Sequence, residues 1–182
     1  MMTAEALACF DRFRSSAFRL ERLPTYVVED EREEIDDWRA HRPRPEYSIR
    51  TSPWLARIAT DTLAGKHWQR LRIVDLPLGE YLRWQLLNYI EAAATGEEIR
   101  IIDRASCPVL AADEDFWLFD ADKAQPFAIA MAYDEDGRPG EHQLVTDVER
   151  LTAYQRTRDA AWKTAVPLNE FLASYDPLAL TA

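Results

Sequence analysis

The sequence predicts an α/β fold, with a mixed sheet that contains a central parallel strand-helix-strand unit, an antiparallel hairpin and flanking helices. Three stretches support this prediction. Residues 68–75 and 98–103 alternate between apolar and charged side chains, as strands do, and residues 80–94 between them have the apolar spacing of a helix. A crossover of this length favours parallel pairing with a right-handed connection, so the carboxyl ends of both strands are expected at one edge of the sheet.

Arg70 and Arg72 share one face of the first strand, and Leu71 and Ile73 share the other, which predicts a half-buried strand. The helix that follows is apolar on more than one side and is expected to be largely buried. Its apolar stripe and the tyrosines beside it are Leu82, Leu86, Ile90, Ala93, Tyr81 and Tyr89. Gly96 is suited to the left-handed residue that follows a helix end.

The N-terminal third is expected to form helices and extended segments around this unit. Residues 3–14 predict a short amphipathic helix, capped by Thr3, that docks on the domain or on a partner. Residues 18–21 and 26–28 are expected to be an edge strand or extended segments, because their alternation is short. Residues 29–40 predict an acidic helix with a solvated face; the alternative is a surface that mimics DNA or steers a partner.

A proline-rich connection then leads to a second predicted helix. Residues 41–53 contain several prolines and arginines and are expected to be irregular, with arginines that balance the acidic helix or grip an anion. Ser52 as cap and Pro53 at the first position predict a helix that ends at Gly65. Its buried side is expected to consist of Trp54, Leu55, Ile58 and Leu63.

The C-terminal half predicts further strands and a long helix. Residues 116–120 are almost wholly apolar, which predicts a strand covered on both faces. Residues 127–133 and 143–145 are expected to pair as a hairpin across an Asp- and Gly-rich turn. Thr146 and Glu149 fit a capping box for a helix that runs to about residue 165.

One main domain is predicted, with an N-terminal helix at residues 1–17, a single α/β domain at residues 18–175 and a tail at residues 176–182. The chain has 182 residues, which is enough for a full core, and 47% of them are hydrophobic, which argues against disorder.

The net charge of -10 disfavours direct nucleic acid binding, because phosphate backbones require clustered positive charge. Basic partners, including a positively charged regulator, fit this charge. Cys9 and Cys107 form neither a disulfide framework nor a metal pattern. No apolar run approaches the roughly 20 residues of a membrane span, and the N-terminus lacks the layout of a signal peptide. A cytoplasmic protein without membrane association is therefore expected.

The sequence lacks the familiar catalytic and cofactor motifs. The histidines are isolated, the glycines form no phosphate-binding loop, and no serine lies in a Gly-x-Ser-x-Gly elbow. The segment Asp134-x-Asp136-Gly137 matches only the start of a calcium loop and is better explained as a turn. No metal, cofactor or catalytic residue is therefore predicted, and the sequence favours a non-enzymatic protein while leaving an enzyme open.

One polar site is expected at the carboxyl edge of the parallel strands. Asp75 and Asp103 end those strands, and Asp115 and Asp120 flank the aromatic strand. Carboxylates gathered there would bind magnesium or act as general acid and base; alternatively they cap helices and pair with arginines. The candidate contacts for a ligand or partner are Arg72, Tyr81, Arg83, Arg100, Asp103, Arg104, Asp115, Trp117, Asp120 and Arg158.

Arg158 lies one helical turn from Tyr154 and from Trp162, on a stripe that otherwise faces the core. An arginine in that place needs a carboxylate or an aromatic face. Two explanations are open: a buried ion pair with Asp103 or Asp120, or contact with an anion.

Five motifs together resemble an uncharacterised actinobacterial family of unknown function, over nearly the whole chain. They are Phe18-Arg19-Leu20-Glu21; Arg72-Ile73-Val74 with Pro77-Leu78 and Tyr81-Leu82-Arg83-Trp84; residues 96–104; Asp115-Phe116-Trp117-Leu118-Phe119-Asp120; and Arg158-Asp159-Ala160-Ala161-Trp162. The resemblance carries over no catalytic residue. It implies a regulatory or accessory role, because such proteins often occur near helix-turn-helix regulators. The chain departs from the pattern at Gly79, where Ser or Thr would cap the long helix.

The strand-helix-strand unit, the aromatic strand and the Ala-x-x-x-Ala helix also resemble the phospholipase D half-fold, which some regulators use as a sensor without catalysis. The active family needs His-x-Lys-x-x-x-x-Asp, and none of His41, His67 and His142 begins that motif. The resemblance therefore implies a non-catalytic version, and a fold alone does not give a function.

Three functions follow as hypotheses. The first is a non-catalytic regulatory or accessory domain whose polar cluster contacts a partner protein, such as a helix-turn-helix regulator, or a small anionic ligand. The second is a small phosphoester or nucleotide hydrolase that uses Asp103, Asp115 or Asp120 with Arg72 or Arg104. The third is an acidic DNA mimic carried by residues 29–37.

Overall fold

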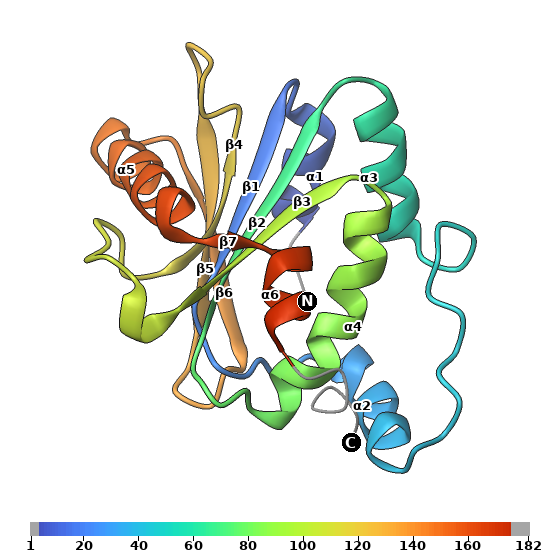
Figure 1. Cartoon of the computed structure of the whole chain (residues 1–182). Helices are drawn as coiled ribbons and strands as arrows, with labels where there is room; N and C mark the ends of the chain where they lie inside the picture. Colours follow the sequence, from blue (N-terminus) through green and yellow to red (C-terminus); the bar gives the residue numbers. More distant parts are fainter. Residues whose placement is uncertain (1–3, 176–182) are drawn as a thin grey trace.

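The chain forms one mixed sheet with helices on both faces in the computed structural model, which describes residues 4–175 (Figure 1). The strands are β1 (Ser16–Glu21), β2 (His67–Val74), β3 (Glu97–Asp103), β4 (Asp115–Phe119), β5 (Phe127–Tyr133), β6 (Pro139–Val145) and β7 (Val166–Pro167). The helices are α1 (Ala4–Arg12), α2 (Arg32–Arg39), α3 (Pro53–Leu63), α4 (Glu80–Ala94), α5 (Val148–Thr164) and α6 (Leu168–Ser174), with 3-10 turns η1 (Glu29–Glu31) and η2 (Arg104–Ser106). Within residues 4–175 the strand order is β6-β5-β4-β1-β2-β3-β7, which confirms the predicted fold class.

The centre of the sheet consists of three parallel strands. β2 and β3 are joined through α4, as predicted, and their register places Val74 beside Asp103 at the carboxyl edge. β1 pairs with β2 on one side and with β4 on the other, so the prediction of an edge strand at residues 18–21 is wrong. Arg19 and Glu21 produce the polar alternation of an edge strand, but their side chains are buried and paired in the interior. Residues 26–28 form a loop rather than a strand.

The other half of the sheet is antiparallel. β4 runs against β1, and the predicted hairpin of β5 and β6 extends the sheet beyond it. The turn of this hairpin packs against the loop after β1, where the Val27 N–H donates to the Gly137 carbonyl oxygen at 2.9 Å. Gly137 has a φ of 82°, and a Cβ there would collide with the carbonyl oxygen of Thr25. Only glycine therefore fits this contact.

Helix α5 covers one face of the sheet together with the segment between β3 and β4, which contributes Cys107, Leu110 and Ala112 (Figure 1). Tyr154 stacks on Phe116 with ring centroids 4.1 Å apart, which fixes the helix over β4. The side chain of Asp147, rather than Thr146, caps the helix by accepting from the Arg150 N–H at 2.9 Å. The predicted capping box is therefore displaced by one residue, because Asp147 also offers a capping oxygen.

The opposite face carries an aromatic core beneath α1 and α3. Phe10 of α1 lies 5.2 Å from Trp54, 5.9 Å from Trp68 and 5.1 Å from Trp117, measured between ring centroids. The N-terminal helix thus docks on the domain itself. Ser52 caps α3 as predicted, accepting from the Leu55 N–H, whereas the predicted Thr3 cap lies outside the described residues.

Two apolar residues predicted to be buried are exposed. Leu63 is 90% exposed because it lies at the last position of α3, beyond the sheet. Ile90 is 40% exposed because α4 turns the side that carries Tyr81, Gln85 and Tyr89 towards the sheet. The sheet presents charged groups there, so tyrosines rather than isoleucine face it. None of the described helices is long and apolar enough to cross a membrane.

The aromatic core gives a first prediction. Phe10→Ala should lower the free energy of unfolding by about 3–5 kcal/mol, because it removes a buried ring between three indoles. Urea denaturation measures the change. The matched control is Leu63→Ala, which should change stability by less than about 0.5 kcal/mol at its exposed position. Equal effects of the two substitutions would contradict docking of α1 on the domain.

Candidate functional site

Six charged side chains lie buried on the face of the sheet that α4 covers. They come from the four neighbouring strands β4, β1, β2 and β3, at alternate positions that place them on the same face. We call them the buried charge network: Arg19, Glu21, Arg70, Arg72, Glu97 and Asp115, each at most 9% exposed. Burial of this many charges requires mutual pairing, because each unpaired ion would cost several kcal/mol of desolvation.

Glu21 is the central carboxylate of this network. Its Oε1 lies 2.6 Å from Nη1 of Arg70 and 3.5 Å from Nε of Arg19. Its Oε2 accepts a hydrogen bond from the hydroxyl of Tyr89. Arg70 also bonds Oε1 of Glu97 through Nε at 2.9 Å. Burial opposes the charge of Glu21, but Arg70 and Arg19 outweigh it and lower its pKa to about 2. Glu21 is therefore ionised throughout the physiological range.

Asp115 is the second carboxylate, at the start of β4. Its Oδ2 lies 3.2 Å from Nη2 of Arg19 and accepts from the hydroxyl of Tyr26, and its Oδ1 accepts from the Arg22 N–H at 3.0 Å. Burial raises the pKa of Asp115, and Arg19 and Tyr26 offset only part of that effect. The Tyr26 hydroxyl also accepts from the N–H groups of Arg22 and Leu23, and these bonds together with the one to Asp115 hold Tyr26 over the end of the sheet.

Arg72 differs from the other two arginines. It is fully buried, yet its Nε and Nη2 atoms have no hydrogen-bond partner, and its Nη1 donates only to the hydroxyl of Tyr26 at 3.3 Å. Its guanidinium also lies 5.0 Å from the centre of the Tyr26 ring. Buried donors without partners are rare in folded proteins and need an explanation. Tyr26 contacts Arg72 on one side and lines a surface cavity on the other.

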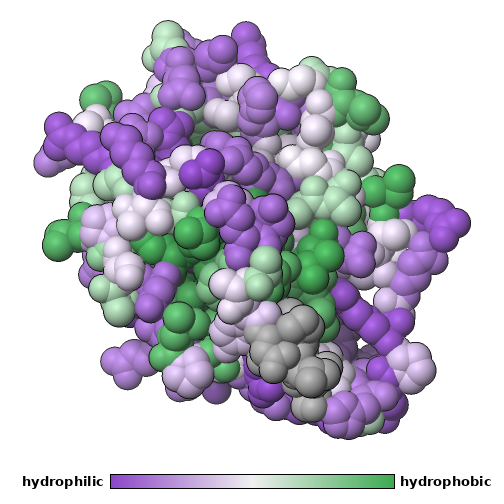
Figure 2. Space-filling model, in the orientation of Figure 1, coloured by the Kyte–Doolittle hydropathy of each residue, from purple (hydrophilic) through white to green (hydrophobic). Residues whose placement is uncertain are grey.

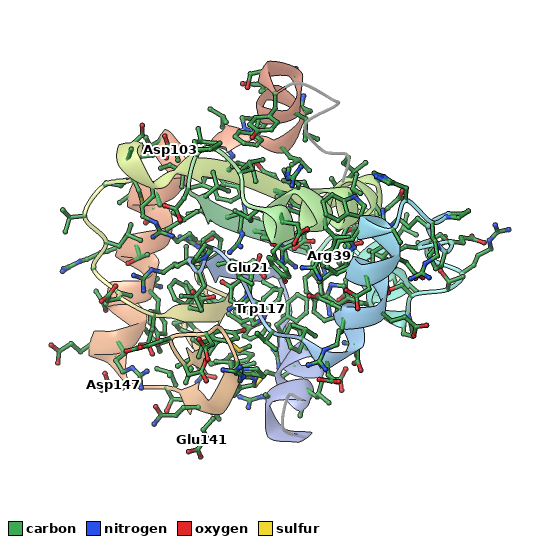
Figure 3. All side chains as sticks on the ribbon, turned by 90° about the horizontal axis from the view of Figure 1, so that it is seen from below. Glu21, Arg39, Asp103, Trp117, Glu141 and Asp147 are labelled. Atoms are coloured by element: carbon green, nitrogen blue, oxygen red, sulfur yellow. The ribbon has the colours of Figure 1, made fainter. Side chains whose placement is uncertain are left out.

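A cavity of about 400 Å³ opens beside Tyr26 and Tyr81, at the carboxyl edge of the parallel strands. We call it the Tyr26–Tyr81 cavity; its other walls are Thr25, Val27, Val28, Arg32, Ile35, Arg39 and Glu80. The two tyrosine rings lie 6.2 Å apart in an edge arrangement. Figure 3 looks onto this edge, with Arg39 on α2 at the side and Glu21 deeper, next to the sheet.

Tyr81 connects the cavity to the acidic segment before α2. Its hydroxyl donates to Oε2 of Glu31 at 2.9 Å and accepts from Nε2 of Gln85 at 3.3 Å. Burial raises the pKa of Glu31 to about 7, although the Tyr81 hydrogen bond acts in the opposite direction. A proton at Glu31 is therefore gained or lost near neutral pH, next to the cavity wall.

Six of the residues predicted from sequence lie at or near the carboxyl edge. Arg72 and Asp115 belong to the buried charge network, Trp117 packs beneath it, and Tyr81 lines the cavity. Arg104 and Asp103 are on the rim. Nε of Arg104 lies 2.7 Å from Oδ1 of Asp75, and Asp103 caps η2 by accepting from the Ala105 N–H. The strand predicted to be half buried, β2, is buried on both faces except near its start, because the arginine face lies under α4.

Four other candidates lie elsewhere. Asp120 is at the opposite edge, because β4 runs antiparallel and ends beside Ser16. Arg100 faces α5 and contacts the Trp162 ring. Arg83 lies 5.5 Å from the centre of the Trp38 ring on α2.

Arg158 pairs with neither Asp103 nor Asp120, which corrects the predicted buried ion pair. Its Nη2 lies 3.2 Å from Asp122, and its Nε lies 2.9 Å from Asp159. Both acids are exposed, because this part of α5 faces the turn after β4. Within residues 4–175, no cluster of three or more histidine, cysteine or acidic side chains could hold a metal ion.

Sequence reasoning missed the centre of the site. Arg19, Glu21, Arg70 and Glu97 were absent from the candidate residues, as was Tyr26. One signal was available: arginines at alternate positions 70 and 72 and an arginine–glutamate pair at 19 and 21 lie in runs that are otherwise apolar. Such alternation fits an exposed face as well as a paired interior one, so it could not locate the site without the strand order.

The model of a domain of unknown function (DUF6879) matches residues 4–173. No curated protein matches the chain significantly.

The buried charge network gives a second prediction. Arg70→Met should lower the free energy of unfolding by about 3–5 kcal/mol, because it leaves Glu21 and Glu97 without their shared cation in the interior. Chemical denaturation measures the loss. Arg50→Met breaks an exposed ion pair with Glu46 and should cost less than about 1 kcal/mol. If Arg70→Met were as mild as this control, the two glutamates would not depend on Arg70.

Glu31 gives a third prediction, which concerns pH. Because the folded protein raises the pKa of Glu31 from 4.5 to about 7, Glu31 stabilises the fold most below pH 4.5, and this contribution is lost as the pH rises to about 7. Glu31→Gln cannot ionise, so its stability relative to wild type should increase between pH 5 and pH 8. Denaturation at several pH values measures this difference. Glu33→Gln removes an exposed negative charge from the first turn of α2, two residues after Glu31, and an identical pH trend in both variants would refute the assignment to Glu31.

Proposed function

The chain belongs to the DUF6879 family, whose description names no activity, and from the geometry we propose that it is a non-catalytic, ligand-binding regulatory domain. The Tyr26–Tyr81 cavity binds a small carboxylate-bearing molecule, and binding of this molecule changes the affinity of the domain for a partner protein. One observation carries this proposal: Tyr26 and Tyr81 line the cavity, and Tyr26 also bonds Asp115 and Arg72 of the buried charge network.

The cavity has the composition of a small-molecule site. Its volume of about 400 Å³ suits a compact organic ligand. Val27, Val28 and Ile35 provide apolar walls, and the two tyrosines provide aromatic ones. Such sites combine apolar walls with a few polar groups that orient the ligand.

The charged groups at the cavity favour a carboxylate. Nη2 of Arg39 lies 2.6 Å from Oε2 of Glu80, and both side chains are about half exposed. Exposed ion pairs contribute little stability, so a ligand carboxylate can replace Glu80 at Nη2 of Arg39 at low cost, while Nη1 keeps its 2.9 Å contact with Asp36. Arg32 provides a second cation on the same wall, and its Nη2 lies 3.2 Å from Oε2 of the exposed Glu29.

Binding is better supported than hydrolysis. Both oxygens of Asp115 are already bonded to groups of the protein, and Asp103 caps η2. Asp120 lies at the other end of β4, at the opposite edge of the sheet. A general base must reach its substrate within hydrogen-bond distance, and these three carboxylates do not converge on a common space.

The acidic segment at residues 29–37 supports a role in signalling rather than DNA mimicry. Its carboxylates pair with nearby arginines, as in Asp36 with Arg39 and Asp37 with Arg42, and Glu31 is bonded to Tyr81. The segment is therefore built into the cavity wall. A ligand that moves Tyr81 would shift α2, whose outer acidic face suits a basic partner such as a helix-turn-helix regulator.

Ligand binding gives the fourth prediction. Phenylacetate, phenylpropionate and indoleacetate should raise the melting temperature of the protein, whereas the matching neutral amides should not, because only the acids can pair with Arg39. Differential scanning fluorimetry followed by calorimetry measures binding. Arg39→Gln should weaken binding of the best acid by about tenfold, as expected for loss of one charge-assisted hydrogen bond.

Arg50→Gln is the matched control, since Arg50 is also an exposed, ion-paired arginine but lies away from the cavity. It should bind the acids as wild type does. If acids and amides bound equally, or if Arg39→Gln and Arg50→Gln had the same effect, the proposed carboxylate site would be wrong.

A further inference from the structure

A second and larger cleft lies at the opposite edge of the sheet, independent of the proposed ligand cavity. Its volume is about 890 Å³. It is enclosed by the end of α1, the turn between β4 and β5, and the first turns of α5. Gln155 of α5 holds the turn in place through a 2.6 Å hydrogen bond from Nε2 to the carbonyl oxygen of Ala121.

The charge of this cleft is opposite to that of the whole protein. Arg12, Arg14 and Lys123 line it, and no ion pair is found for any of them within residues 4–175, although most other described arginines have one. The chain as a whole has a net charge of -10. Three unneutralised cations on such an acidic protein form a local site of positive potential.

The one carboxylate in the lining does not neutralise these cations. Asp120 accepts hydrogen bonds from the backbone N–H groups of Arg14, Ser15 and Ser16, at 2.9, 2.7 and 3.2 Å, and from the Ser15 hydroxyl. Asp120 holds a left-handed backbone with a φ of 51°, which keeps it in this arrangement. The Asp120 oxygens thus bond the backbone at the amino end of β1. The side chains of Arg12, Arg14 and Lys123 remain available to pair with an anionic partner.

The cleft also has an apolar side. Val148 is 76% exposed at the start of α5, and Leu151 and Phe127 lie behind it. The guanidinium of Arg12 lies 4.6 Å from the centre of the Phe127 ring, which is only 6% exposed. No open aromatic face is therefore offered for stacking of a nucleobase, whereas an aliphatic side chain can contact Val148.

We propose that this cleft binds an acidic segment of a partner protein, in which carboxylates pair with Arg12, Arg14 and Lys123 and an aliphatic side chain packs on Val148. Charge complementarity selects the partner: the rest of the acidic surface repels an acidic segment, and the cleft attracts it. The cleft and the Tyr26–Tyr81 cavity then serve two different binding partners.

Fluorescence anisotropy with a labelled peptide, Glu-Glu-Leu-Glu-Asp-Leu-Glu-Glu, tests the proposal on the full chain. The peptide should bind, and its Kd should rise with salt, because screening shortens the range of the charges to about 8 Å at 0.15 M. The double variant Arg14→Glu and Lys123→Glu should weaken binding by about tenfold or more, since two attractive charges become repulsive.

The matched control reverses Arg156 and Lys163, two exposed cations of α5 that are not part of the cleft lining. This double variant has the same net charge and should change Kd by less than about twofold. Val148→Ser should also weaken binding, and because it adds no charge it tests the apolar contact separately from the cations; at 76% exposure the substitution should leave folding intact. All variants are compared by thermal denaturation.

Three results would overturn the proposal: no binding of the acidic peptide, equal losses in the cleft and control variants, or unchanged binding in Val148→Ser. A labelled single-stranded oligonucleotide is measured in parallel. If the oligonucleotide bound more tightly than the peptide and lost affinity in the cleft variant alone, the cleft would be a nucleic-acid site rather than a peptide site.

Discussion

Arg19, Arg70 and Arg72 can be buried beneath α4 because carboxylates are buried beside them. Glu21 is the central one of these carboxylates. It neutralises Arg70 and Arg19, and its register partner in the parallel ladder is Arg72. A shift of β1 by one residue would carry Glu21 and Arg19 together to the face beneath α5 and leave Arg70 and Arg72 of β2 without Glu21. The network therefore specifies the register of the central strands as well as the position of the tyrosines above them.

Much of the fold could be predicted from sequence, because periodicity identified β2, α4, β3 and the hairpin directly. The prediction failed at β1, where the alternation of Arg19 and Glu21 with apolar residues has two physical meanings: an exposed face or an ion-paired interior. The rule that parallel strands end at one edge placed Asp75 and Asp103 there, and Arg72, Tyr81 and Asp115 were named as candidates near the same edge, where the structure has them. Tyr26 and Glu21 were missed because they belong to β1 and its loop, and Asp120 was misplaced because the direction of β4 was unknown.

The two edges of the sheet have different chemical characters. The carboxyl edge has a small cavity with tyrosines and an exposed ion pair, backed by buried charges. The amino edge has a larger cleft with three cations that have no acidic partner among the described residues. The net charge of the chain hides this contrast, since an average over the surface cannot show that most cations are paired and a few are not. Figure 2 shows hydrophilic residues over much of the face seen there, with apolar residues gathered in patches between them.

The contact between Gly137 and the loop after β1 has a consequence for how the family can vary. Hairpin tips normally accept insertions and substitutions, because they project into solvent and support nothing else. Here the tip packs against Thr25 and bonds Val27, and both residues belong to the cavity wall. Lengthening this turn, or placing any side chain at its glycine, would deform a binding wall that is remote in sequence. In the proposed function, changes at this turn would alter the ligand preference of the cavity, although Gly137 is not part of its lining.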